Sequence, residues 1–171
     1  LNRLAAQYPG RISIHALDVV DHEQIEQLAK TLSNEAIDLL INNTGVYPPA
    51  RGDAFGETDY AAWRYAFEVN TMAPLKIAEA FIQQISRSRL KTIVTITSKM
   101  GSIADNRGGG SYIYRSSKAG INIVMKSLSI DLSAEQVSRL TDNIIWMVRQ
   151  TAADKNGNSV EVLVPKVYAV A

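Results

Sequence analysis

Residues 37–45 have the sequence Ile-Asp-Leu-Leu-Ile-Asn-Asn-Thr-Gly, a short apolar run that ends in a polar turn. A nearly continuous apolar run of this length is typical of a parallel strand that is covered on both faces. Asn and Gly tolerate unusual backbone angles, so we expect a loop over residues 42–56 that a ligand can approach closely. The alternative is a simple turn that binds nothing.

The segment before this strand combines a strand pattern with a helix pattern. Residues 11–17 (RISIHAL) alternate apolar and other side chains, which predicts a strand. Asp21 has the features of an N-cap, with Gln24 three residues later as in a capping box. The apolar spacing that follows predicts an amphipathic helix over residues 22–33. Strand, helix and strand thus succeed one another along this part of the chain.

The same alternation continues after the loop. Thr58 is expected to cap a long helical stretch that reaches Ser86 and contains Pro74. The other predicted elements are a strand at 93–96, an exposed glycine-rich loop at 101–111, a helix at 112–132, a second helix at 134–149 and a strand at 160–164. Short apolar strands joined by crossover helices predict an α/β fold with a doubly wound, mostly parallel sheet.

Composition excludes several classes of function. The chain has 171 residues, 46% of them hydrophobic, which fits a single globular domain with a real core. Its 18 Lys and Arg nearly balance 17 Asp and Glu, so we expect no nucleic-acid or anionic-membrane partner. It has no Cys and two His, so we expect no metal site. Without an apolar segment of about 20 residues or a signal sequence, we expect a cytoplasmic protein.

Doubly wound sheets bind ligands beyond the carboxyl ends of their strands. The predicted strands place three polar segments at that edge. They are Asp18 with Val19 after the first strand, the turn from Asn42 to Gly45 after the second, and Ser98 after the third. The chemistry of the protein is therefore expected there.

Tyr114 and Lys118 form a Y-x-x-x-K pair at the start of a predicted helix. Residues four apart share a helix face, so the ammonium can lie beside the phenol and lower its pKa. Such a pair can move a proton at a substrate oxygen. Ser98 could donate a hydrogen bond to the same oxygen. The alternatives are a surface pair for Tyr114 and Lys118, and a turn-stabilising hydroxyl for Ser98.

Asn70 lies four residues before Pro74 in the long predicted helix. Proline has no N–H, so the backbone carbonyl of Asn70 loses its usual intrahelical donor. The freed carbonyl needs another partner, and an ordered water held there could serve a proton relay. A simple helix kink is the alternative.

Taken together, these residues resemble the short-chain dehydrogenase/reductase family, which has a Rossmann-like fold. The family's ordered motifs are similar to the turn from Asn42 to Gly45, Asn70, Ser98 and the Tyr114–Lys118 pair. The stretch from Ser98 to Ala119 resembles the branch that contains the C-factor signalling proteins and the sniffer-type carbonyl reductases. The resemblance covers roughly residues 1–132.

The resemblance implies hydride transfer between NADP or NAD and a small carbonyl or alcohol substrate. It implies that Tyr114 is the general acid/base, that Ser98 polarises the carbonyl and that Asn70 holds the relay water. Lys118 would lower the Tyr114 pKa and hold the nicotinamide ribose. The implied cofactor-binding residues are Asp18, Val19, Asn42, Gly45, Tyr114 and Lys118.

The chain also departs from the family pattern. Thr44 stands where the family usually has Ala, and nothing before Leu1 supplies the first strand and glycine-rich loop. We therefore expect a longer protein, with segments missing before Leu1 and near Leu132. Family members commonly form dimers or tetramers, so a homodimer or homotetramer is expected. The alternative function is a non-catalytic signalling or binding protein that keeps the fold without cofactor.

Overall fold

The computed structural model describes residues 2–49 and 52–132. Its elements are α1 (Asn2–Gln7), α2 (His22–Thr31), β1 (Leu39–Asn42), α3 (Tyr60–Phe67), the π-helical turn η1 (Glu68–Met72), α4 (Ala73–Ser86), β2 (Thr92–Thr95), the 3-10 turn η2 (Lys99–Gly101) and α5 (Tyr112–Asp131). The predicted helix at 134–149 and strand at 160–164 lie outside the described residues.

The two described strands form a parallel pair, as the sequence predicts. Leu39 pairs with Thr92 and Asn42 pairs with Thr95 at the other end. Leu40 and Ile93 are almost fully buried, as expected for strands covered by helices. The α/β class and the parallel sheet are confirmed.

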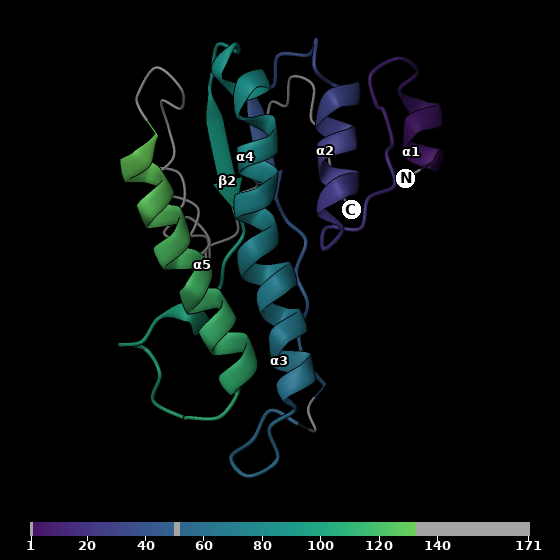
Figure 1. Ribbon diagram of the computed structural model, residues 1–171. Coiled ribbons are helices and arrows are strands. Elements are labelled where there is room, and N and C mark those ends of the chain that lie inside the picture. The colour runs from purple at the N-terminus through teal and green to yellow at the C-terminus, as the bar shows by residue number, and fades with distance from the viewer. Residues whose placement is uncertain (1, 50–51, 133–171) are drawn as a thin grey trace, which may run out of the picture.

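The helices surround this pair and build the core with it. In Figure 1, α3, η1 and α4 follow one another as a nearly continuous column, with α5 on one side and α2 on the other. Helix α4 contacts both strands, and α5 packs against η1, α3 and η2. Among the described residues, no helix is long and apolar enough to cross a bilayer.

The start of α2 is confirmed, but the strand predicted before it is wrong. Asp21 caps α2 by accepting hydrogen bonds from the N–H groups of Glu23 (3.0 Å) and Gln24 (3.1 Å). Residues 11–17 contain no strand. A strand needs a hydrogen-bonded neighbour, and among the described residues only β1 and β2 pair. The apolar residues Ile14 and Ala16 are exposed, so the alternation in the sequence does not correspond to a buried strand face among the described residues.

The long predicted helix is divided into three pieces, and its cap is not Thr58. Asp59 caps α3 through the N–H groups of Ala61 (2.8 Å) and Ala62 (3.0 Å). The Thr58 hydroxyl instead donates to the Ala54 carbonyl, 3.1 Å away. A carboxylate is a better N-cap than the threonine before it, since its oxygen reaches two N–H groups at once.

Pro74 explains the break between α3 and α4. It lies in the first turn of α4, where its missing N–H is tolerated best. Just before it, the Ala73 N–H bonds to the Glu68 carbonyl five residues back, which makes η1 a wide π turn. Asn70 lies inside this turn and is 1% exposed. The predicted kink is thus a π-helical turn centred on the candidate site residue.

Candidate active site

The carboxyl ends of β1 and β2 lie at the same edge of the sheet because the strands are parallel. The loop after β1 carries Gly45, and the segment after β2 carries Ser98. Helix α5 runs beside this edge and carries Tyr114 and Lys118. The fold therefore gathers the predicted residues at one edge.

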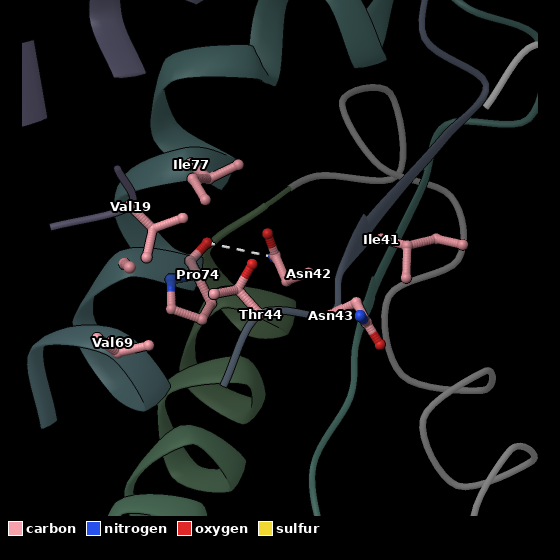
Figure 2. Close-up of a pocket in the computed structure, with 9 residues that line it drawn as sticks. Val19, Ile41, Asn42, Asn43, Thr44, Val69, Pro74 and Ile77 are labelled. Carbon is pink, nitrogen blue, oxygen red and sulfur yellow. Dashed lines mark hydrogen bonds between the residues drawn. The ribbon is translucent and has the colours of Figure 1, made fainter. Parts of the chain in front are cut away.

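A small pocket joins the predicted adenine-side residue Val19 to the loop after β1. Its lining residues are Val19, Ile41, Asn42, Asn43, Thr44, Val69, Ala73, Pro74 and Ile77. Figure 2 shows Val19 above Pro74 on one wall and Asn42 and Thr44 facing them. The neighbouring Asp18 is exposed, and its Oδ1 accepts a hydrogen bond from the Val20 N–H at 3.1 Å. The side chain of Gln24 accepts from the Asp18 N–H (3.1 Å), which fixes this turn.

Asn42 is a buried connector at the end of β1. Its Nδ2 donates to the Pro74 carbonyl (3.4 Å) and to the Thr95 hydroxyl (3.2 Å). The residue is 6% exposed. These contacts of Nδ2 tie the strand end to α4 and β2.

The Asn70 side chain is fully engaged. Its Oδ1 accepts from the Val46 N–H (2.8 Å), and its Nδ2 donates to the Val46 carbonyl (2.9 Å) and the Ser117 hydroxyl (3.0 Å). It therefore fastens the loop after β1 to α5. Pro74 removes the i+4 donor of the Asn70 backbone carbonyl, so this carbonyl is the group that the residue could offer to a water.

Lys118 is buried at the centre of the site, with 5% of its surface exposed. Its Nζ donates to the Ile96 carbonyl at 3.1 Å and lies 5.8 Å from the centre of the Tyr114 ring. Burial lowers the pKa of the Lys118 ammonium because desolvation penalises its charged form. A Cβ on Gly45 would lie 3.5 Å from this Nζ and 3.3 Å from Asn70 Oδ1. The structure thus brings Gly45, Asn70, Lys118 and Tyr114 together.

Ser98 reaches the site through the short turn η2. Its Oγ accepts a hydrogen bond from the Met100 N–H at 3.1 Å, which leaves the hydroxyl hydrogen available for donation. Gly101 ends η2 and presses against α5, since a Cβ there would lie 2.8 Å from the carbonyl carbon and oxygen of Lys118. Only glycine allows the Ser98 turn to approach the helix that closely.

Three residues of this site were not assigned a role from the sequence. Ser117 accepts from Asn70 and donates to the Tyr114 carbonyl at 2.9 Å. The Tyr47 ring lies 4.5 Å from the Tyr114 ring, centre to centre. Gly101 makes the close contact with α5. The one available signal is Ser117, a small polar residue on the inner face of an amphipathic helix.

No group of three or more His, Asp or Glu side chains that could hold a metal ion occurs within residues 2–49 and 52–132. The site is built from hydroxyls, an ammonium, amides and backbone carbonyls. Such groups can bind and protonate an oxygen atom, and they can contact sugar hydroxyls.

The comparisons with known proteins concern the family and the fold of this chain. Residues 1–142 match the sequence model of the short chain dehydrogenase family. C-signal from Myxococcus xanthus is 39% identical over 99 residues, which are 58% of this chain and 58% of C-signal.

Two solved structures have the same fold. A short-chain dehydrogenase/reductase from Burkholderia multivorans, solved with bound NADP, is 32% identical with a TM-score of 0.70, and the match covers 77% of this chain and 56% of that one. Carbonyl reductase Sniffer of D. melanogaster is 25% identical with a TM-score of 0.70, covering 80% of this chain and 60% of that one. The chain thus spans under two thirds of the length of each of these relatives. Because the family match extends over most of its residues, the chain belongs to the short-chain dehydrogenase family.

Proposed function

We propose that the protein is an oxidoreductase that transfers a hydride between NADPH or NADH and a small carbonyl or alcohol compound. The observation that carries this proposal is the buried Lys118, whose ammonium lies beside the Tyr114 ring at the ligand-binding edge of a parallel sheet. Family membership and the NADP bound to the Burkholderia relative support it.

The residues at the sheet edge would border a dinucleotide. Val19, Asn43 and Thr44 line a small pocket at the end of β1 and would lie beside its adenosine end, and the exposed Asp18 lies next to Val19. Gly45 keeps the loop free of a side chain beside the Lys118 ammonium. The ammonium has three donors and uses one on Ile96 within the described part of the chain. The other two are available for ribose hydroxyls. The bound cofactor would supply the hydride.

Proton transfer to and from the substrate oxygen would depend on Tyr114, Lys118 and Ser98. Tyr114 would donate its phenolic proton to the oxygen as the carbonyl is reduced, and would accept it back in the oxidation. The positive charge of Lys118 favours the phenolate that this transfer leaves. The Ser98 hydroxyl, held as acceptor by the Met100 N–H, would donate to the same substrate oxygen.

Asn70 would contribute its backbone rather than its amide. The side chain is occupied by Val46 and Ser117, whereas Pro74 leaves the Asn70 carbonyl without an i+4 donor. A water on that carbonyl would pass protons between Lys118 and solvent. In this proposal the Asn70 side chain fastens the loop to α5, and the Asn70 backbone carbonyl binds the water.

We also propose a single oxidoreductase domain in the cytoplasm, assembled as a homodimer or homotetramer. Exposed apolar side chains on α3, η1 and α5 support self-association, among them Tyr65, Met72 and Ile123. Light scattering coupled to size exclusion gives the mass directly, and a monomeric mass at micromolar concentration contradicts the assembly.

Cofactor titration tests the proposed function. Trp63 donates its indole N–H to the Ser116 hydroxyl on α5, 2.9 Å away, so its fluorescence is sensitive to changes at this helix. NADPH or NADH should alter the tryptophan emission of the protein with saturation, and addition of a small aldehyde or ketone should then consume the reduced cofactor. Failure of both cofactors to bind would refute the proposal.

A non-catalytic signalling protein is the second candidate, and the relative named C-signal favours it. The two functions differ in whether they require the phenolic hydroxyl of Tyr114. A signalling role needs the fold but not the phenol, so its activity should survive the change Tyr114→Phe. Turnover that depends on the phenol supports the enzyme instead.

A further inference from the structure

Helix α5 begins without a cap of its own. Ser111, the residue before it, has a left-handed backbone (φ 49°), and its side chain makes no capping hydrogen bond. A helix start leaves several N–H groups without intrahelical partners. The first turn of α5 contains Tyr114, so whatever satisfies these groups also orients the proposed acid/base.

Asp53, about sixty positions earlier in the chain, provides the missing cap. Its Oδ1 accepts a hydrogen bond from the Ile113 N–H at 2.7 Å, and its backbone carbonyl accepts from the Ser111 N–H at 3.1 Å. The residue is 8% exposed. Its Oδ2 is buried and has no hydrogen-bond partner among the described residues. One oxygen of the carboxylate thus caps the start of α5, where the negative charge of Asp53 suits the helix dipole.

Residues close to Asp53 in the sequence hold it in place. Gly52 has a φ of +94°, and its carbonyl accepts from the Asp59 N–H at 2.8 Å. Asp59 caps α3, so this segment links the starts of α3 and α5. The Tyr47 hydroxyl lies 3.4 Å from Ser111 Oγ, and its ring lies against Tyr114. The loop after β1 therefore contacts the Tyr114 turn at two points.

We propose that Asp53 is a positioning residue for Tyr114, acting as a cap supplied to α5 from the loop after β1. This inference rests on the proposed function and adds a residue to it. Asp53 acts through the Ile113 N–H and fixes the first turn of α5, and with it the direction of the Tyr114 phenol. Small displacements of a reacting group can cost large factors in rate, so the cap affects turnover more than binding.

Asp53→Ala, Asp53→Asn and Asp59→Ala in the full-length protein test the proposal. Asp59 is a control because its carboxylate also caps a helix start, that of α3, and the residue lies outside the proposed site. For Asp53→Ala, kcat should fall about tenfold while KM and the NADPH dissociation constant change less than about twofold. Asp53→Asn retains an acceptor oxygen and should recover kcat to within about threefold. Asp59→Ala should keep the wild-type kcat although its melting temperature falls.

Hydrogen exchange separates this inference from the proposed function. The Ile113 amide should exchange faster in Asp53→Ala than in wild type, whether or not the protein turns over. Wild-type kcat in Asp53→Ala, an equal loss of kcat in Asp59→Ala, or no rescue by Asp53→Asn would overturn the inference. If Asp53→Ala does not fold, Asp53→Glu keeps the charge and shifts its oxygens, and wild-type kcat in that variant would overturn it too. A wild-type protein that binds no cofactor would refute the proposed function alone.

Discussion

The asparagines at the end of β1 and in η1 are used differently from the polar residues on the α5 side of the site. The side-chain amide of Asn42 bonds to Pro74 and Thr95. The side-chain amide of Asn70 bonds to Val46 and Ser117. By contrast, within the described part of the chain the Ser98 hydroxyl hydrogen is free and Lys118 uses one of its three donors. The asparagines therefore stabilise the fold around the site, whereas the Ser98 hydroxyl and the Lys118 ammonium can bind a ligand. Changes to the asparagines should cost stability, whereas changes beside α5 should cost turnover.

The change Tyr114→Phe should have the largest effect, and it should fall on turnover alone. Removing the proton donor should lower kcat by about 10²- to 10⁴-fold. The phenol makes no hydrogen bond among the described residues and the ring contact with Tyr47 is retained, so the melting temperature should stay within a few degrees. Steady-state kinetics and thermal unfolding check both parts. A large fall in the melting temperature of Tyr114→Phe would contradict the prediction that changes beside α5 affect turnover and not stability.

The change Asn70→Ala should affect stability more than the corresponding change at Asn42. It removes three hydrogen bonds and leaves the Val46 N–H and carbonyl unpaired, which should lower the free energy of unfolding by about 3 kcal/mol. Urea unfolding measures this. Asn43→Ala is the control, since Asn43 is exposed and should cost under about 0.5 kcal/mol. Equal effects of the two variants would contradict the role of Asn70.

The change Gly101→Ala should reduce stability and turnover together. Its Cβ would lie 2.8 Å from the Lys118 backbone, so η2 must move away from α5 and take Ser98 with it. Overpacking of this kind costs about 1–3 kcal/mol. Gly108→Ala is a matched control because nothing lies within 4 Å of its added Cβ. An active, fully stable Gly101→Ala would show that the close contact is not needed.

The smallest effect concerns pH and Lys118. Burial lowers the Lys118 pKa in the folded state, so between that value and about 10.4 the unfolded chain binds more protons. The free energy of unfolding of the wild type, relative to Lys118→Met, should therefore rise with pH across this window. Lys126→Met, which changes an exposed lysine of the same helix, should not alter the slope. If the free energy of unfolding of the wild type, relative to Lys118→Met, falls with pH, the conclusion that burial lowers the Lys118 pKa is contradicted.

Local patterns predicted the features that depend on local interactions. The apolar run before Asn42 became β1, Asp21 capped α2, and the spacing of Tyr114 and Lys118 placed both on one helix. The effect of Pro74 on its helix was also predictable, because it follows from a missing N–H.

Features that depend on distant contacts were missed. Residues 11–17 have strand periodicity, yet pairing depends on a neighbour. The Asn70 amide is directed at Val46, and the Asp53 carboxylate at Ile113, because the fold places those groups there. Neither contact leaves a pattern in the surrounding sequence, so the roles of these side chains became visible only in three dimensions.

Isotope transfer tests the central claim most directly. The protein would be incubated with a small aldehyde or ketone and with NADPH or NADH carrying deuterium at C4 of the nicotinamide, on either face in separate reactions. Mass spectrometry of the alcohol should find one deuterium on the former carbonyl carbon for one labelled face, and little alcohol from Tyr114→Phe. Alcohol without deuterium from both faces, or none from the wild type with either cofactor, would contradict hydride transfer at this site.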